Sequence, residues 1–222
     1  MTKDFFFYVD YFRFKRMLSL KNKHKKEFFN QNGCGLEIEF GVNYSHVSSA
    51  YIRTGLLKLK QCVDGRGKFV TDNTIGCDMN FEIVLDPQSK EDLKNVVIHI
   101  KEILGYYENF VLNEHCGVHA NFLADENLKK AFYDKLVGGY YKPEMFTHNK
   151  YKVDFLEIAV RDGKKLSYEE FAAYQKNVSA KYTGVNFLKP GLIEFRALSL
   201  DWDKIEYVID LYEEIKKEYS FC

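Results

Sequence analysis

The sequence has no surplus of charge of either sign, which excludes functions that depend on overall electrostatics. Lysine plus arginine and aspartate plus glutamate both number 32 in a chain of 222 residues, so the formal net charge is zero. A neutral chain has no overall attraction for nucleic acid or for an acidic membrane surface. We therefore expect no nucleic-acid partner, and any function that depends on charge must be local to one group of residues.

The sequence also lacks a cysteine framework. Its five cysteines are odd in number, and none lies in a Cys-x-x-Cys or Cys/His spacing. This pattern argues against a disulfide scaffold and against a structural zinc site. A reducing compartment is the resulting expectation, and we predict that the protein is cytoplasmic.

Long apolar runs are absent too. The N-terminal stretch MTKDFFFYVDYFRFKRMLSL is aromatic, but charged residues interrupt it too often for a signal peptide or a membrane span. Repeats and low-complexity linkers are also missing. The sequence predicts one main domain over residues 31–222, an N-terminal helical segment over residues 1–30 packed on it, and no membrane partner.

The rest of the chain alternates between strand-like and helix-like apolar spacings. Strands are predicted at residues 35–43, 67–71, 80–86, 116–123, 183–188 and 191–198. Helices are predicted within residues 4–29, from an N-cap at Ser45 through residue 57, from Ser89 through residue 104, and at 125–137, 167–180 and 203–218. Most strands are joined by hairpins or single helices, and their alternation gives each one buried face and one open face. We predict an α+β domain in which helices pack on the apolar face of an antiparallel sheet.

One predicted strand, GLEIEFG at residues 35–41, carries two acids in an apolar setting. Successive strand side chains point to opposite faces, so Leu36, Ile38 and Phe40 share one face. Glu37 and Glu39 share the other. This strand therefore presents a core face and a carboxylate pair.

Three further strands place ionisable or amide groups on the face opposite their apolar residues. These groups are Glu82 in NFEIVLD, His119 and Asn121 in GVHANFL, and Glu194 and Arg196 in GLIEFRAL. A half-solvated sheet is commonly polar on its outer face, so each strand alone is weak evidence of a site. Four carboxylates on neighbouring strands, however, would repel one another unless a cation lies among them.

The residue types in this set indicate a particular chemistry. Glutamate oxygens with one imidazole suit hard divalent ions such as Mg²⁺ or Mn²⁺. A guanidinium beside them, here Arg196, is suited to holding the oxygens of a transferring phosphoryl group. The residues therefore predict a metal-dependent phosphoryl-transfer site on the open face of the sheet.

The order of these segments resembles the amidoligase family, carboxylate–amine ligases related to glutamine synthetase and glutamate–cysteine ligase. The resemblance covers residues 35–205 and rests on GLEIEFGV, TDNT, FEIVLDP, CGVHANF, KYTGVNF and GLIEFRALSLD. It implies a catalytic domain in which glutamate-lined antiparallel strands hold Mg²⁺ and ATP. It also implies that ATP phosphorylates a substrate carboxylate and that an amine then attacks the acyl phosphate.

The resemblance assigns roles to individual residues. The implied metal ligands are Glu37, Glu39, Glu82, His119 and Glu194. Arg196 is implied as the phosphate or transition-state cation and, with Glu39 and Glu82, as a catalytic residue. Glu37, His119, Glu194 and Arg196 are expected at the nucleotide, together with Lys181 and Asn186. Asp72 and Asn121 are expected at the substrate, which is a carboxylate or an amine on a small molecule, peptide or protein side chain.

Two departures from the family pattern keep other functions open. The chain has His119-Ala120-Asn121 where the family commonly has His-x-His, and Asp72-Asn73-Thr74 where it has Asp-Gly-Ser. An asparagine is a poorer metal ligand than an imidazole. One alternative is a metal-dependent kinase or hydrolase on the same sheet. The other is a degenerate ligase fold that acts as a nucleotide- or protein-binding module.

Overall fold

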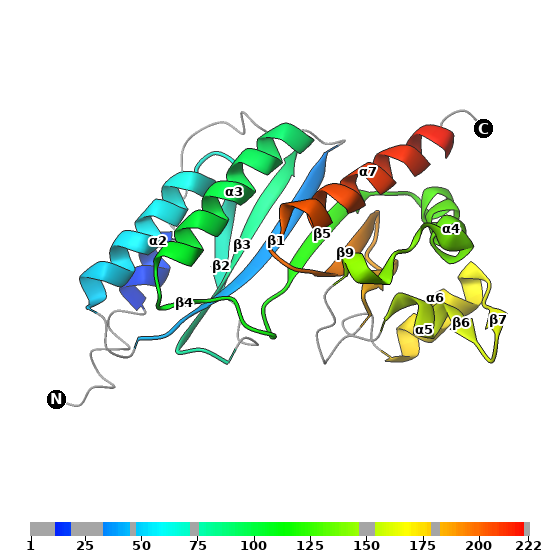
Figure 1. Ribbon diagram of the computed structural model, residues 1–222, viewed down its shortest axis with the longest axis horizontal. Coiled ribbons are helices and arrows are strands. Elements are labelled where there is room, and N and C mark those ends of the chain that lie inside the picture. Colours follow the sequence, from blue (N-terminus) through cyan, green and yellow to red (C-terminus); the bar gives the residue numbers. More distant parts are fainter. Residues whose placement is uncertain are drawn as a thin grey trace.

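The centre of the protein is a β-sheet with helices packed against it (Figure 1). The coordinates are those of a computed structural model that describes residues 12–18, 33–44, 48–71, 76–146, 154–178 and 183–219. The strands of the main sheet are β1 (Cys34–Val42), β2 (Gly67–Thr71), β3 (Met79–Gln88), β4 (Phe110–Val111), β5 (Val118–Leu123), β8 (Val185–Asn186) and β9 (Leu192–Leu198).

The strand order across the sheet is β2-β3-β1-β5-β9-β8, with β4 paired to the end of β1. Every pairing described in this sheet is antiparallel. The predicted α+β class with an antiparallel sheet is therefore confirmed. The predicted strand at 80–86 is too short, because β3 continues through Pro87 to Gln88, with a register shift opposite the start of β1.

The helices are α2 (Ser49–Val63), α3 (Lys90–Tyr106), α4 (Glu126–Lys135), α5 (Phe155–Ala159), α6 (Tyr168–Val178) and α7 (Trp202–Tyr219). A π-helical turn, η1 (Leu136–Tyr140), and a 3₁₀ turn, η2 (Pro143–Met145), follow α4, which ends two residues before the predicted limit of 137. The hairpin of β6 (Val160–Arg161) and β7 (Lys164–Lys165) lies in a stretch for which the sequence made no prediction, as does α5.

Helices α2, α3 and α7 lie side by side across one face of the sheet (Figure 1). The apolar side chains of β1 point into this layer, and Leu36, Ile38 and Phe40 are fully buried there. Helix α3 begins after Ser89 as predicted, and the Ser89 hydroxyl accepts the backbone N–H of Asp92. The predicted cap of α2 is wrong by three residues, because the helix begins after Ser48 rather than Ser45.

A second group of helices, α4, α5 and α6, packs at the β8 end of the sheet (Figure 1). Its interior is aromatic, with Tyr133, Phe155 and Phe171 in ring contact with one another. The fully buried amide of Gln175 on α6 binds the backbone of the β8 region: its nitrogen donates to the Val185 carbonyl at 2.5 Å and its oxygen accepts from the Phe187 N–H at 3.1 Å. A side chain thus supplies hydrogen-bond partners to the outer side of this edge strand, where the Thr183 hydroxyl also donates to the Val185 carbonyl at 3.0 Å.

Part of the predicted N-terminal segment belongs to the same core. Residues 12–18 are helical, Phe14 and Leu18 are buried, and Lys60 on α2 donates to the Met17 carbonyl at 2.5 Å. The remainder of residues 1–30 lies outside the described ranges.

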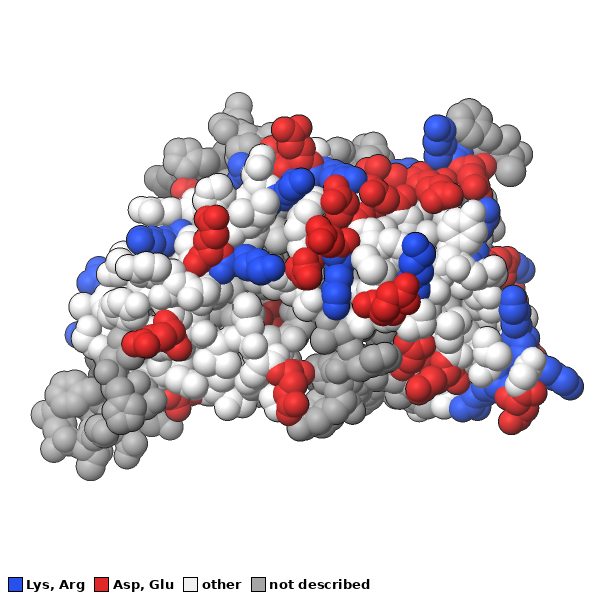
Figure 2. Space-filling model, in the orientation of Figure 1, with Lys and Arg blue, Asp and Glu red and all other residues white. Residues whose placement is uncertain are grey.

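The helix-covered face is strongly charged on its surface (Figure 2). Acidic side chains gather along α7, and Lys90 at the start of α3 pairs with Glu206 at 3.0 Å and Asp210 at 2.6 Å. Among the helices that the structure describes, none has both the length and the apolar character needed to cross a bilayer.

Candidate metal centre

The face of the sheet opposite these helices collects the polar side chains that the sequence singled out. Glu37 on β1 lies directly across from His119 on β5, and Asn121 on β5 lies across from Glu194 on β9. Glu194 is also paired in register with Asn186 on β8. Directly opposed residues project on the same side of a sheet, so four strands bring these groups together.

Three of the predicted metal ligands form one compact group. Glu37, His119 and Glu194 each present a donor atom, and these atoms lie within 4.8 Å of one another. The Nδ1 atom of His119 is 3.0 Å from a Glu37 oxygen and 3.8 Å from a Glu194 oxygen. Two carboxylates and one imidazole are a donor set that fits a divalent cation such as Mn²⁺ or Mg²⁺.

The three ligands differ in their access to solvent. The side chains of Glu194 and His119 are 1% and 4% exposed, whereas that of Glu37 is 22% exposed. Glu194 therefore forms the floor of the group, and Glu37 forms its solvent side.

Sequence reasoning missed a residue at the centre of this group. Lys189, in the turn between β8 and β9, places its ammonium 2.8 Å from a Glu194 oxygen and 3.3 Å from a Glu37 oxygen. It also donates to the Asn121 side-chain oxygen at 3.2 Å. The sequence did carry a signal, because crowded carboxylates require a cation and Lys189 is five residues before Glu194.

These contacts keep both acids ionised. Burial raises the pKa of Glu37, but the hydrogen bond from His119 and the charge of Lys189 outweigh it and lower that pKa to about 2. Burial likewise raises the pKa of Glu194, and the charge of Arg196 with the Lys189 hydrogen bond produces a net lowering. Burial lowers the pKa of Lys189, yet its bonds to the two acids raise it overall. The group is thus a set of charges matched to one another at neutral pH.

The second oxygen of Glu194 is held from the far side of the site. It accepts from Arg196 Nη1 at 3.2 Å and from Asn186 Nδ2 at 2.9 Å. The Asn186 oxygen in turn accepts the backbone N–H of Leu188 at 2.9 Å. Asn186, predicted at the nucleotide, here positions a metal-ligand candidate, and its role toward nucleotide stays a prediction.

Strand β9 contains a β-bulge next to Arg196. Phe195 pairs with Ala120 and Leu198 pairs with Val118, so β9 has one residue more than β5 between these pairs. The extra residue lets Phe195 and Leu198, which are three positions apart, both remain buried. Bulges of this kind redirect a side chain, and here it is Leu198 that departs from alternation and turns to the buried face, whereas Arg196 keeps the face of Glu194.

Glu39 and Glu82 lie next to the compact group rather than inside it. They are directly opposed on β1 and β3. One Glu39 oxygen accepts the backbone N–H of Gly117 at 2.7 Å, and the other lies 3.9 Å from His119 Nε2. The imidazole therefore stands between acids, with one nitrogen toward Glu37 and the other toward Glu39. Roles for Glu39 and Glu82 as direct metal ligands stay predictions.

The two substrate candidates have different outcomes. Asn121 is part of the site: its side-chain nitrogen donates to Glu37 at 3.1 Å while its oxygen accepts from Lys189. Asp72 lies outside the described residues, and so does Lys181, the other predicted nucleotide contact.

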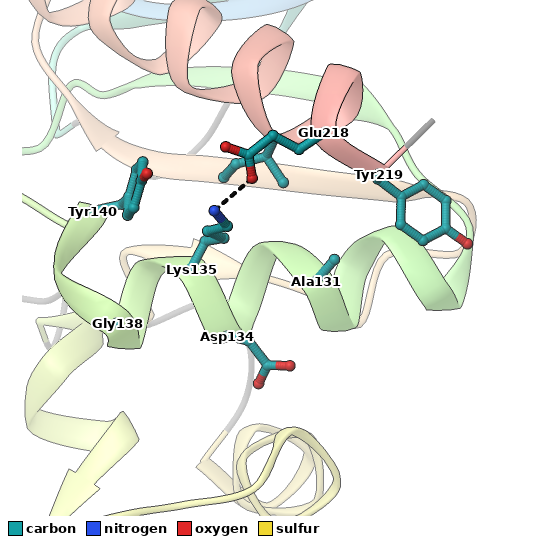
Figure 3. Close-up of a pocket in the computed structure, with 8 residues that line it drawn as sticks. Ala131, Asp134, Lys135, Gly138, Tyr140, Glu218 and Tyr219 are labelled. Atoms are coloured by element: carbon teal, nitrogen blue, oxygen red, sulfur yellow. Dashed lines mark ion pairs between the residues drawn. The ribbon is translucent and has the colours of Figure 1, made fainter. Parts of the chain in front are cut away.

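A separate pocket lies between α4 with η1 and the end of α7 (Figure 3). Its volume is about 400 Å³, and an ion pair between Lys135 and Glu218 crosses it at 2.5 Å. Tyr140, Tyr219 and Asp134 are among the residues that line it, and the Asp134 side chain points away from α7 (Figure 3). This pocket holds no described group of metal-ligating residues.

Comparison of the chain with protein-family models and with curated protein sequences finds no match. What the fold and site define is an α+β protein whose antiparallel sheet carries a group able to hold a metal, Glu37, His119 and Glu194.

Proposed function

We propose that this protein is an ATP- and Mg²⁺-dependent ligase that joins a carboxylate to an amine through an acyl phosphate. The observation that supports the proposal is the convergence of Glu37, His119 and Glu194 beside Arg196 on one face of an antiparallel sheet. Phosphoryl transfer requires positioned divalent metal and a fixed cation for the transferring oxygens, and this donor set suits both needs. The proposal includes the finer fold assignment, a catalytic domain like those of glutamine synthetase and glutamate–cysteine ligase.

Each residue has a defined task in this proposal. Glu37, His119 and Glu194 hold the ion, which when bound neutralises phosphate oxygens and aligns them with the substrate carboxylate. Arg196 stabilises the charge on the transferring phosphoryl group, and it is rigid because Glu194 holds its guanidinium at 3.2 Å. Glu39 adds negative charge on the Nε2 side of the imidazole, with its nearest carboxylate oxygen 3.9 Å from that nitrogen. The substrates are an acid and an amine, and the proposed location is the cytoplasm.

The direct test is turnover by the purified full chain. ATP, Mg²⁺ and panels of carboxylic acids and amines are supplied, and both ADP and new amide products are measured. We expect ADP and an amide in equal amounts from the wild type, loss of both in Glu194→Gln, and normal activity in Glu213→Gln, whose side chain is exposed on α7. ADP release without an amide would indicate a kinase or hydrolase, and equal ADP release by wild type and Glu194→Gln would refute the proposal.

A binding module is the second candidate, and one observation favours it. The ammonium of Lys189 already neutralises the acids that a metal would otherwise neutralise. Such a site can remain stable without catalysing a reaction. Calorimetry with Mg²⁺ and a non-hydrolysable ATP analogue, combined with the turnover test, distinguishes the two. Failure to bind the analogue would favour a protein-binding module, and binding without ADP release from ATP with any acid and amine would favour a nucleotide-binding one.

A further inference from the structure

Lys189 occupies a complete binding site for an ammonium group. Its Nζ atom contacts one oxygen each from Glu194, Glu37 and Asn121, at 2.8, 3.3 and 3.2 Å. Three acceptors match the three N–H donors of an ammonium. Two of the acceptors belong to residues of the candidate metal group, so the lysine and a metal ion would share ligands.

A divalent ion and this ammonium would disfavour each other in one site. Both are cations, and both need the negative charge of Glu37 and Glu194. A divalent ion placed beside the ammonium would repel it, and each cation would weaken the attraction between the other cation and the two carboxylates. Binding of the metal therefore favours departure of the lysine head group.

The lysine is also the part of the site that can move. Glu37, His119 and Glu194 stand on paired strands of the sheet, whereas Lys189 belongs to a turn and its side chain is 33% exposed. Its backbone is anchored, because its carbonyl accepts from the buried Lys129 side chain at 2.9 Å. The flexible stem can carry the ammonium to water while the turn stays in place.

We propose that Lys189 is an internal cation that holds Glu37 and Glu194 together until a divalent ion displaces it. The displacement leaves an ammonium at the solvent side of the site, where an anionic phosphate or carboxylate of the substrate would meet it. This inference rests on the metal site of the proposed function. It makes Lys189 a positioning residue that couples metal binding to recognition of an anion.

The first test measures Mn²⁺ binding by calorimetry to the wild type, Lys189→Met and Lys164→Met. Methionine is neutral and similar in length, and Lys164 is an exposed lysine on β7 that serves as the matched control. We expect Lys189→Met to bind Mn²⁺ about tenfold more tightly, the scale of removing one neighbouring charge in a partly solvated site. Lys164→Met is expected to match the wild type. Lys189→Gln provides a second neutral variant should the methionine variant not fold.

The second test follows the ammonium itself. Lysines of the wild type are reductively methylated with and without Mn²⁺, and modification at each position is read by mass spectrometry. We expect Lys189 to be protected without Mn²⁺ and to become several-fold more reactive with it, while Lys164 reacts equally in both conditions.

The outcomes separate this inference from the proposed function. Wild type that binds Mn²⁺ while Lys189→Met binds it equally or more weakly would overturn the inference and leave the metal site standing. Binding by Lys189→Met alone would show that Lys189 occupies the site but is not displaced by the ion, which would overturn both the displacement and a metal-dependent ligase. If neither protein binds Mn²⁺ and methylation of Lys189 is unchanged, both ideas are overturned.

Discussion

Glu194 shows how a buried carboxylate is kept charged in this protein. Its side chain is 1% exposed, and an ionised carboxylate in that position is unstable unless every oxygen has a partner. One oxygen accepts a hydrogen bond from the Lys189 ammonium, and the other accepts hydrogen bonds from Asn186 and Arg196. Such a residue is suited to bind a cation because its charge is already formed and fixed in direction.

The neighbouring acid, Glu37, makes stability dependent on pH. Its pKa is about 2 in the folded protein against 4.5 for an unperturbed glutamate, so its contribution to stability is complete above pH 4.5 and is lost as the pH falls toward 2. The shift corresponds to at most about 3 kcal/mol. The Glu37→Gln variant has no carboxyl group to titrate at this position. We predict that its free energy of unfolding falls less than that of the wild type as the pH decreases from 4.5 toward 2.

Urea denaturation of metal-free protein between about pH 3 and 7 measures this effect. Other acids titrate in the same range, so the difference between wild type and variant is the informative quantity. Glu213→Gln, an exposed substitution, is expected to follow the wild type. Parallel pH profiles for wild type and Glu37→Gln would show that His119 and Lys189 do not stabilise the Glu37 carboxylate.

At the scale of elements, the position of β8 depends on a helix side chain. Gln175 on α6 bonds to Thr183, Val185 and Phe187, and β8 in turn supplies Asn186 to Glu194. The hydrogen bond from Asn186 to Glu194 in the metal group therefore depends on the contact between Gln175 of α6 and the β8 region.

We predict that Gln175→Ala destabilises the fold by about 1–3 kcal/mol, because it removes the acceptor of the buried Phe187 N–H and one of the two donors to the Val185 carbonyl. Urea denaturation gives the stability change, and amide hydrogen exchange at Phe187 reports the loss of its bond to Gln175. Gln61→Ala, an exposed glutamine on α2, is the matched control with no expected change. Unaltered exchange at Phe187 in Gln175→Ala would contradict the role given to Gln175.

At the scale of the whole molecule, the candidate ligands come from distant parts of the chain. Glu37, His119 and Glu194 meet only after β1, β5 and β9 have paired. An ion that binds them binds the folded state and not the unfolded chain, so binding adds to stability.

We predict that excess Mn²⁺ raises the melting temperature by about 5–10 °C, the shift that corresponds to an ion at a hundred times its dissociation constant in a domain of this size. A chelator should reverse the shift, Glu194→Gln should abolish it, and Glu213→Gln should retain it. Thermal unfolding followed by circular dichroism makes the measurement. An equal shift in Glu194→Gln would place the stabilising ion elsewhere.

Much of the site was predictable because strand geometry has a period of two. Once GLEIEFG is recognised as a strand, Leu36 and Glu37 must face opposite ways, and the same rule separates Phe195 from Glu194. The polar side chains of different strands come together when those strands are neighbours in the sheet. The alternation of strands and helices along the chain favoured an antiparallel sheet of this kind. The rule holds for Glu194 and Arg196 but does not extend past the bulge in β9, where Phe195 and Leu198 are three positions apart and both buried.

The sequence by itself determined the α+β class, the acidic face of β1 and the residues able to bind metal, because these follow from local periodicity and donor chemistry. Only the tertiary structure decided which acids converge: Glu37 and Glu194 with His119, and Glu39 with Glu82 beside them. It also decided that Lys189 is the cation among the acids. The physical reason is that the register of the strands and the course of the turn bring together residues far apart in sequence, such as 37 and 189. A local sequence pattern does not specify which distant residues become neighbours in the fold.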